Sequence, residues 1–416
     1  MKKLILASVV GLSCLSQSVL AKDITVWAWD PNFNIAIMQE AADVYKSKHS
    51  DVNINVVEFS KTEIEQKLHT MLASGVTSAL PDVVLIEDYN VQKYLQSYPG
   101  SFYEMTNDID YSQFAPYKRS IVTFDDKVYG LPFDTGVTGL FYRTDILAKA
   151  GFTHTDLNNI TWDRFIEIGQ QVKEKTGISL LGANPSNDFQ LIRLMVHSGG
   201  SWYFNKDGTF NIKNNKVVQE SVRIFRDLNL AGIVRPTIGW SEWVGSINNG
   251  SVASVITGVW IIPSIKAGKD QEGKWALAPT PRLNIDGAVN YSNLGGSSWF
   301  VLSASKEKQT AIDFLNTTFA SDKEFYNTIL TNQGAVGSYL PAGNTDAYQT
   351  EDVHFNGQRI YSEFNEWIAK IPAIDYGMYT YEVDAAIAAQ MPSIMKGLPI
   401  EEALERVEQQ LKYQIQ

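Results

Sequence analysis

The chain of 416 residues carries 35 Lys and Arg against 46 Asp and Glu, which gives a formal net charge of -11 at pH 7. This acidic balance argues against nucleic acid or an anionic membrane surface as the partner. The length exceeds what one hydrophobic core usually organises, so the sequence predicts two lobes.

The first 21 residues have the pattern of a cleaved signal peptide. Two lysines precede an apolar stretch over residues 4–15, and a small-residue cleavage site ends at Ala21. The apolar stretch is shorter than the ~20 residues that a membrane-spanning helix needs. We therefore expect export to the periplasm and a mature chain from Lys22, with a formal charge of -13 because two lysines and no acids are removed (33 basic against 46 acidic residues).

Strand and helix patterns alternate from Lys22 onward. Residues 23–29, 52–59 and 81–88 are typical of strands, and residues 35–48 and 62–74 of amphipathic helices. This order predicts βαβ units in a mostly parallel sheet, with ligands bound at the carboxyl ends of the strands. The residues that follow the first and third strands, and therefore share one rim, are Trp29, Asp30, Glu87, Asp88 and Tyr89.

Residues 129–152 (YGLPFDTGVTGLFYRTDILAKAGF) contain two extended runs around a flexible, glycine-containing middle. We expect this segment to carry the chain from one lobe into the other, with Asp134 at the crossing. Helical patterns dominate beyond it, and residues 276–282 are extended again, as in a return crossing. The predicted boundaries are 22–132 and 282–317 for the first lobe, and 133–281 and 318–416 for the second.

The aromatic content favours a sugar-binding site. Sugars present apolar C–H faces and hydroxyl edges, so their binders combine flat aromatic rings with carboxylates and amides. The chain has 10 Trp, 19 Tyr and 19 Phe, although many of these must form core. Trp260 is the favoured platform because it follows a glycine that permits close backbone approach. Trp29 alternates with Trp27 along a strand, so one of the two faces the core, and we select Trp29, which is nearer the rim, as the exposed one. Trp240 and Trp243 could equally stack on a sugar or anchor a surface loop.

The polar candidates come from strand ends and loops. Asp30, Glu87, Asp88 and Asp134 are candidates to bind hydroxyl groups, although Asp30 or Asp88 could merely cap a following helix. Asp188, or its neighbour Asn187, could reach a hydroxyl, or Asp188 could be an N-cap. Gly296 and Ser297, with Gly295, could offer backbone amides at a strand start, or the glycines could mark only a bulge.

Several segments together resemble the extracellular solute-binding proteins of ABC importers, in the sugar-binding branch. These are the 129–152 segment, TWDRF (161–165), SVASVITGVW (251–260), GGSSWFVLSASK (295–306) and GLPIEEAL (397–404), while VWAWDPNFN and PDVVLIEDY are most similar to the lactose and oligosaccharide type. The resemblance implies an α/β, two-lobed periplasmic-binding-protein fold of type II, with several crossing segments as a hinge.

The resemblance also implies the function. We expect a monomer that binds a di- or oligosaccharide between the lobes and delivers it to the permease, with no catalytic activity and no cofactor. A tryptophan at the place of Trp260 forms a sugar platform in this family. The family supplies another aromatic contact from near residues 376–381, and among Tyr376, Tyr379 and Tyr381 we select Tyr379.

Other chemistries have weaker support. The five histidines lack a metal-ligand spacing, no GxSxG, phosphate-loop or dinucleotide pattern occurs, and the only cysteine, Cys14, falls inside the signal. A secreted glycosidase with Glu87 and Asp134 as its carboxylates is one rival. A binder of a polyamine or ferric ion is the other.

Overall fold

The protein is described from a computed structural model, which covers residues 22–184, 189–205 and 207–415. The predicted signal peptide and the candidates Asn187 and Asp188 lie outside these ranges.

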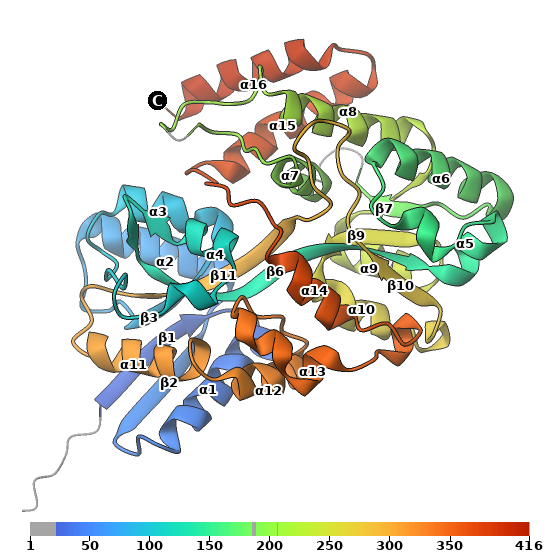
Figure 1. Cartoon of the computed structure of the whole chain (residues 1–416). Helices are drawn as coiled ribbons and strands as arrows, with labels where there is room; N and C mark the ends of the chain where they lie inside the picture. Colours follow the sequence, from blue (N-terminus) through green and yellow to red (C-terminus); the bar gives the residue numbers. More distant parts are fainter. Residues whose placement is uncertain (1–21, 185–188, 206, 416) are drawn as a thin grey trace, which may run out of the picture.

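The first lobe is built on three parallel strands in the order β2-β1-β3 (Figure 1). A helix follows each strand, which confirms the predicted βαβ units. Ser60 and Glu63 form a capping box that starts the second helix and places Lys61 in its first turn. The elements are β1 (Lys22–Ala28), α1 (Ala36–Lys46), β2 (Val52–Glu58), α2 (Lys61–Ser74), β3 (Val83–Glu87) and α3 (Val91–Ser97).

Two long strands, β6 (Gly130–Arg143) and β11 (Asn293–Val301), run between the lobes (Figure 1). The first half of β6 pairs with β11, and its second half pairs with β9 (Ser254–Gly258) and β10 (Trp275–Ala278). The full order is β10-β6-β11-β3-β1-β2, with β9 also on β6. Within the 129–152 segment, residues 130–143 form this crossing strand and residues 144–150 are helical.

The sheet is mixed, whereas we expected a mostly parallel sheet in each lobe. β9, β10 and β11 all run antiparallel to β6, so parallel pairing dominates only in the first lobe. The residue pattern reveals which strands are buried, but it does not encode the direction in which a strand pairs with a partner over 100 residues away.

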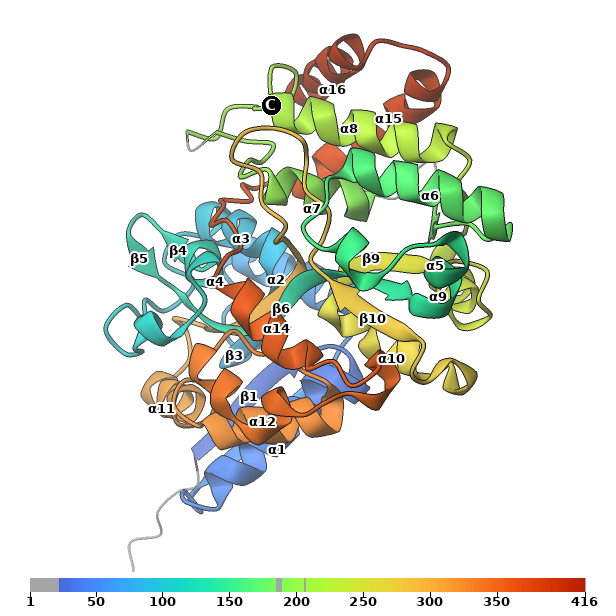
Figure 2. The same ribbon diagram turned by 45° about the vertical axis from the view of Figure 1, so that its right-hand side comes forward.

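Helices cover the second lobe and form its far end. Figures 1 and 2 both show α8, α15 and α16 grouped together. Trp162, Trp202 and Trp275 are among its fully buried side chains. The elements are α5 (Thr144–Ala150), α6 (Trp162–Thr176), β7 (Leu181–Ala183), α7 (Phe189–Ser198), α8 (Lys216–Leu230), β8 (Val234–Pro236), α9 (Gly239–Asn248), α10 (Ile262–Lys266), α15 (Thr380–Met395) and α16 (Ile400–Gln414).

The predicted boundary at residue 318 conflicts with the packing. Phe319 lies against Phe133 and Trp299, with ring centroids 5.3 and 5.9 Å apart, and α11 and α12 both contact α1. This apolar contact keeps the chain on the first lobe beyond residue 317. The remaining elements are α4 (Pro116–Ile121), β4 (Thr123–Phe124), β5 (Lys127–Val128), α11 (Lys308–Phe319), α12 (Lys323–Gln333), α13 (Asp346–Gln349) and α14 (Ile360–Ile368).

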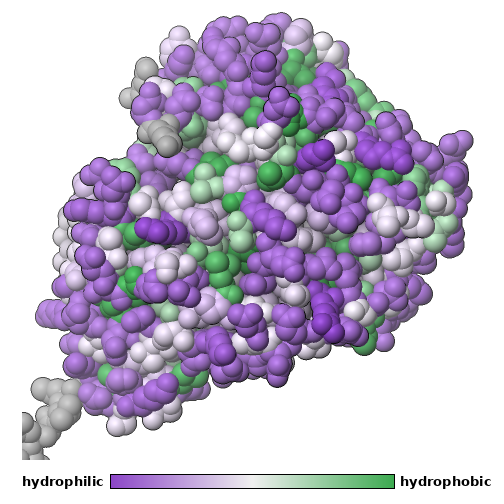
Figure 3. Space-filling view, in the orientation of Figure 1, coloured by the Kyte–Doolittle hydropathy of each residue, from purple (hydrophilic) through white to green (hydrophobic). Residues whose placement is uncertain are grey.

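The visible surface is mainly hydrophilic, with small hydrophobic areas scattered over it (Figure 3). Among the helices of the described ranges, none combines the length and the apolar composition needed to cross a membrane.

Candidate ligand-binding cleft

A cavity of about 830 Å³ lies between the lobes, within the usual size range of small-molecule sites. Elements of both lobes line it, together with the two crossing strands. The predicted site residues that line it are Trp29, Asp30, Glu87, Tyr89, Asp134, Trp240, Trp260, Gly296 and Ser297.

Three tryptophans of the second lobe form a cluster beside the cavity. The ring centroid of Trp240 lies 5.5 Å from that of Trp243 and 5.9 Å from that of Trp260. Trp240 and Trp260 line the cavity, and Trp240 is 55% exposed. Trp243 instead donates from Nε1 to the carbonyl oxygen of Gly182 at 3.1 Å. The sequence left open whether these two tryptophans stack on a ligand or anchor a loop. Trp240 exposes a ring surface to the cavity, whereas Trp243 anchors α9 to β7.

Backbone contacts fix the orientation of the Trp260 ring. Its Nε1 donates to the carbonyl oxygen of Leu294 on β11 at 2.9 Å. A Cβ atom on Gly258 would lie 2.2 Å from the same nitrogen. Glycine at position 258 therefore permits the close approach that the sequence predicted.

Trp29 and Asp30 form part of the first-lobe wall. Trp27 is buried against Phe59, whereas Trp29 lines the cavity, as the strand alternation predicted. Asp30 has φ 63° and accepts a hydrogen bond from the Asn32 amide at 3.1 Å, so it also caps the turn after β1.

Asp134 lies on β6 at the crossing. Its Oδ1 accepts hydrogen bonds from both the amide and the hydroxyl of Ser297, at 2.7 and 2.6 Å. Burial raises the pKa of the Asp134 carboxyl, while Lys118 and the two Ser297 hydrogen bonds lower it. Neither of these two hydrogen bonds uses Oδ2 of Asp134.

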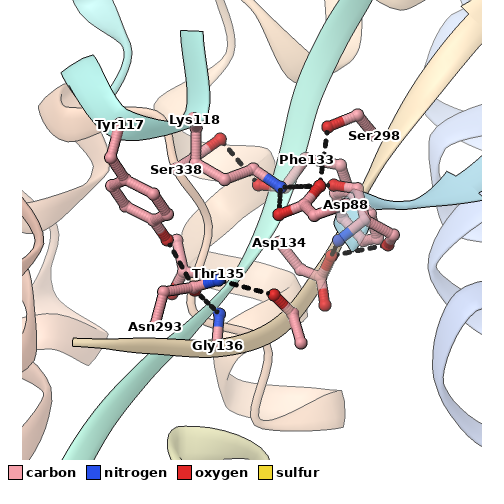
Figure 4. A network of polar contacts seen from close by, with 12 residues as sticks. Asp88, Tyr117, Lys118, Phe133, Asp134, Thr135, Gly136, Asn293, Ser298 and Ser338 are labelled. Atoms are coloured by element: carbon pink, nitrogen blue, oxygen red, sulfur yellow. Dashed lines mark hydrogen bonds and ion pairs between the residues drawn. The ribbon is translucent and has the colours of Figure 1, made fainter. Parts of the chain in front are cut away.

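Asp88 does not line the cavity, so its prediction as a cleft residue was wrong. Its side chain is fully buried and pairs with the equally buried Lys118 at 2.7 Å (Figure 4). Burial raises the pKa of Asp88 to about 7, against the opposing effect of Lys118. Asp88 begins the turn after β3, and that turn directs its side chain into the lobe rather than toward the rim.

Glu87 takes part in a bridge between the lobes. Lys61 donates to its Oε2 at 2.5 Å, and the hydroxyl of Tyr381 on α15 donates to the same oxygen at 2.5 Å. Arg193 on α7 lies over the Tyr381 ring, with its guanidinium carbon 5.5 Å from the centroid, and pairs with Asp384 at 3.3 Å. The cavity is lined by all four of these side chains, Lys61, Glu87, Arg193 and Tyr381. We call the contacts among Lys61, Glu87 and Tyr381 the rim bridge.

Tyr381, rather than the selected Tyr379, lies at the cavity. Tyr379 instead lines a separate groove, where its ring packs near that of Phe204. Tyr376 is 1% exposed and packs on Trp202 and Tyr89. Tyr89 itself is only 2% exposed, so it contributes to the cavity wall mainly by packing against its neighbours.

Three basic residues at or beside the cavity were not predicted from the sequence, namely Lys61, Lys118 and Arg193. The capping box of Ser60 and Glu63 marks Lys61 as the first residue of a helix that follows a strand. This signal could have placed Lys61 near the carboxyl ends of the strands. Lys118 and Arg193 lie inside helices with no local pattern that distinguishes them. Within the described ranges, no group of three or more His, Cys, Asp or Glu side chains gathers as metal ligands do.

Solved structures with the same fold define the class of this protein. MalE, a sugar-binding protein from Xanthomonas citri, gives a TM-score of 0.79 at 16% identity, covering 94% of this chain and 96% of its own. An ABC-transporter-associated binding protein from B. animalis subsp. lactis Bl-04, solved with β-1,6-galactobiose, gives 0.72 at 24% identity, covering 94% and 97%. The chain is a two-lobed α/β protein with the type II periplasmic-binding-protein fold, which confirms the predicted fold class.

The chain belongs to the bacterial extracellular solute-binding proteins, a family that matches residues 40–359. A lactose-binding protein from Rhizobium radiobacter is 50% identical over 417 residues, which is 100% of this chain and 99% of that protein. An arabinooligosaccharide-binding protein from Bacillus subtilis is 26% identical over 335 residues, covering 77% and 75%. The family resemblance inferred from the sequence is confirmed.

Proposed function

We propose that this protein is the substrate-binding component of an ABC sugar importer, and that it binds a di- or oligosaccharide, with lactose as the first candidate. The observation that carries the proposal is the combination of exposed indole surface on Trp240 and Trp260 with the carboxylates of Asp30 and Asp134 around one cavity. The rings match the apolar C–H faces of a sugar, and the carboxylates match its hydroxyl groups.

The proposed mechanism is closure of the lobes around the sugar. β6 and β11 connect the lobes, so rotation about these strands would open and close the cavity. A sugar favours the closed form to the extent that it binds that form more tightly than the open one. The permease would then recognise the closed arrangement.

The proposal includes the cellular setting. Export by the signal at residues 1–21 would deliver a monomer to the periplasm, where it meets the transmembrane subunits of the permease. As lobe assignment, we propose residues 22–132 and 282–317 for the first lobe, extended by α12, and most of 133–281 and the C-terminal helices for the second.

Binding without catalysis also fits the carboxylates. A glycosidase needs an acid and a second carboxylate directed at one bond. Glu87 is engaged by Lys61 and Tyr381, and Asp134 by Ser297. Release of reducing sugar by the purified protein, lost in Glu87→Gln, would overturn the assignment.

Thermal unfolding of residues 22–416 with a panel of disaccharides tests the proposal, with spermidine and ferric citrate as non-sugar controls. A ligand that binds only the native state adds about 2.7 kcal/mol at a hundredfold excess over its Kd. We expect lactose or a related disaccharide to raise the melting temperature, and Trp260→Ala to lose that rise. A response to spermidine or ferric citrate alone would refute the sugar assignment while leaving the fold unaffected.

A further inference from the structure

A lysine outside the cavity is fully buried next to it. The Lys118 side chain, on α4, has no solvent exposure and donates to both carboxylate oxygens of Asp88 at 2.7 Å and to the carbonyl oxygen of Ser297 at 2.8 Å (Figure 4). Removing two charges from water is costly, and well-packed apolar residues are often at least as stabilising as such a pair. Stability alone therefore gives no sufficient reason for this ion pair.

Ser297 links the ion pair to the cavity. Its carbonyl oxygen accepts from Lys118, while its amide and hydroxyl both donate to Oδ1 of Asp134. Asp88 also accepts from the Ser298 hydroxyl at 3.3 Å. Ser297 therefore connects Lys118 to the carboxylate of Asp134, which lines the cavity.

The neighbouring residue on α4 holds the other end of the same segment of β11. The Tyr117 hydroxyl donates to Oδ1 of Asn293 at 3.0 Å (Figure 4). The same oxygen accepts from the Gly136 amide at 2.9 Å, and Nδ2 of Asn293 donates to the Gly295 carbonyl at 2.7 Å. Tyr117 and Lys118 therefore hold both ends of the segment from Asn293 to Ser297.

This segment requires such support because its sheet pairing is irregular. The pairing of β11 with β6 shifts register on either side of Gly296, and such bulges leave backbone groups outside the regular ladder. Gly295 and Gly296 have φ of 85° and 95°, in the left-handed region. A Cβ atom at position 296 would lie 2.7 Å from Oδ2 of Asp88, so the ion pair leaves no room for a side chain at the bulge.

We propose that Lys118 is a positioning residue for the ligand-binding cleft: with Asp88 it fixes the β11 bulge, and through Ser297 it sets the place of the Asp134 carboxylate. Its effect on sugar affinity rests on the proposed function. Its effect on the bulge does not, and the test uses this difference.

A double variant separates positioning from stability. Lys118→Met alone leaves the Asp88 carboxyl buried without its partner, so loss of folding would be uninformative. Lys118→Met with Asp88→Leu replaces the pair by apolar side chains and removes the buried charges. We expect a melting temperature close to that of the wild type, with the Kd for lactose raised about tenfold, the equivalent of one net hydrogen bond. Lys127→Met, which removes a surface lysine paired with Glu104, is the matched control.

Hydrogen exchange of the ligand-free protein provides a readout that does not depend on the sugar. Amides of residues 293–298 should exchange faster in the double variant and at the wild-type rate in Lys127→Met. A double variant with wild-type exchange in this segment overturns the proposal, and wild-type lactose affinity in that variant overturns it equally. If the wild-type protein does not bind lactose, the sugar assignment fails, whereas the exchange rates still decide the role of Lys118.

Discussion

At the scale of single residues, Gly258 determines where the Trp260 ring lies. The indole occupies the space that a side chain at position 258 would fill, and it is held there by Leu294 on the other crossing strand. Gly258 has φ -70°, which any residue adopts, so the need for glycine is purely steric.

We therefore predict that Gly258→Ala weakens sugar binding, although position 258 itself has no side chain that could contact the ligand. The added methyl group would displace the Trp260 ring and break its hydrogen bond to Leu294. We expect at least tenfold weaker binding by calorimetry, since aromatic anchors in binding sites commonly contribute more than ~1.4 kcal/mol.

Gly245→Ala is the matched control, because a Cβ atom there would meet no atom within 4 Å. Unchanged affinity in Gly258→Ala would show that the Trp260 ring contributes little to the site.

The sequence predicted those site residues whose position follows from strand ends. Trp29, Asp30 and Asp134 follow or lie within strands whose pattern is visible, and all three line the cavity. Asp88 also follows a strand, but its direction depends on Lys118, thirty residues later and on a helix with no visible marker. Tyr379 was selected from three neighbouring tyrosines, but α15 begins at Thr380 and its first turn carries Tyr381 to the cavity.

At the scale of elements, the rim bridge connects the end of β3 and the start of α2 with α15 of the second lobe. A second pair, Lys93 with Glu382 at 2.9 Å, joins α3 to α15 nearby. Both sets of contacts join the two lobes. They should contribute to the closed arrangement before a ligand is bound.

Tyr381→Phe should shift the ligand-free protein toward an open arrangement. The change deletes the hydrogen bond to Glu87 and keeps the ring over which Arg193 lies. A net hydrogen bond contributes about 0.5–1.5 kcal/mol, which corresponds to a population change of roughly two- to twelvefold. We expect a larger radius of gyration by small-angle X-ray scattering.

Tyr379→Phe, on the neighbouring turn but outside the cleft, serves as the control. If both variants scatter as the wild type does, the rim bridge has no role in holding the lobes together.

At the scale of the whole molecule, a buried histidine links stability to pH. His197 is 1% exposed and hydrogen-bonds to the Pro372 carbonyl at 2.8 Å, within a cluster that includes Trp202 and Tyr376. Burial lowers the pKa of His197 to about 4, against the effect of the Pro372 and Asn293 carbonyls. Because the unfolded chain binds this proton near pH 6.5, the stability contributed by His197 is complete above that pH and is lost as the pH falls toward 4.

His197→Gln should therefore flatten the acid side of the stability profile. The predicted difference from wild type grows between pH 6.5 and 4 to at most about 3 kcal/mol. Asp88 and Asp384, whose pKa values burial raises to about 7 and about 6, act with the opposite sign over this range. Denaturant unfolding of both proteins at several pH values isolates the histidine, and parallel profiles would contradict the prediction.

The overall architecture was predictable because strand and helix periods are local, and because the crossing segment has an unusual composition. The mixed sheet and the place of α12 were not, since both depend on contacts between distant segments. Nothing in the sequence around Phe319 indicates on which lobe its ring packs.

The residues around the cavity differ in their distance from the two crossing strands. A rotation moves an atom in proportion to its distance from the axis, and Asp134 and Ser297 lie on the strands that would contain that axis. Under the proposed closure these residues would hold a sugar almost equally well in both arrangements, and equal affinity for two states shifts nothing between them. Trp240 on α9 and Tyr381 on α15 lie on the moving lobe and would travel much further. The residues on the crossing strands would then determine the initial binding of a sugar to the open form. Trp240 and Tyr381, far from the axis, would determine how slowly the sugar dissociates from the closed form.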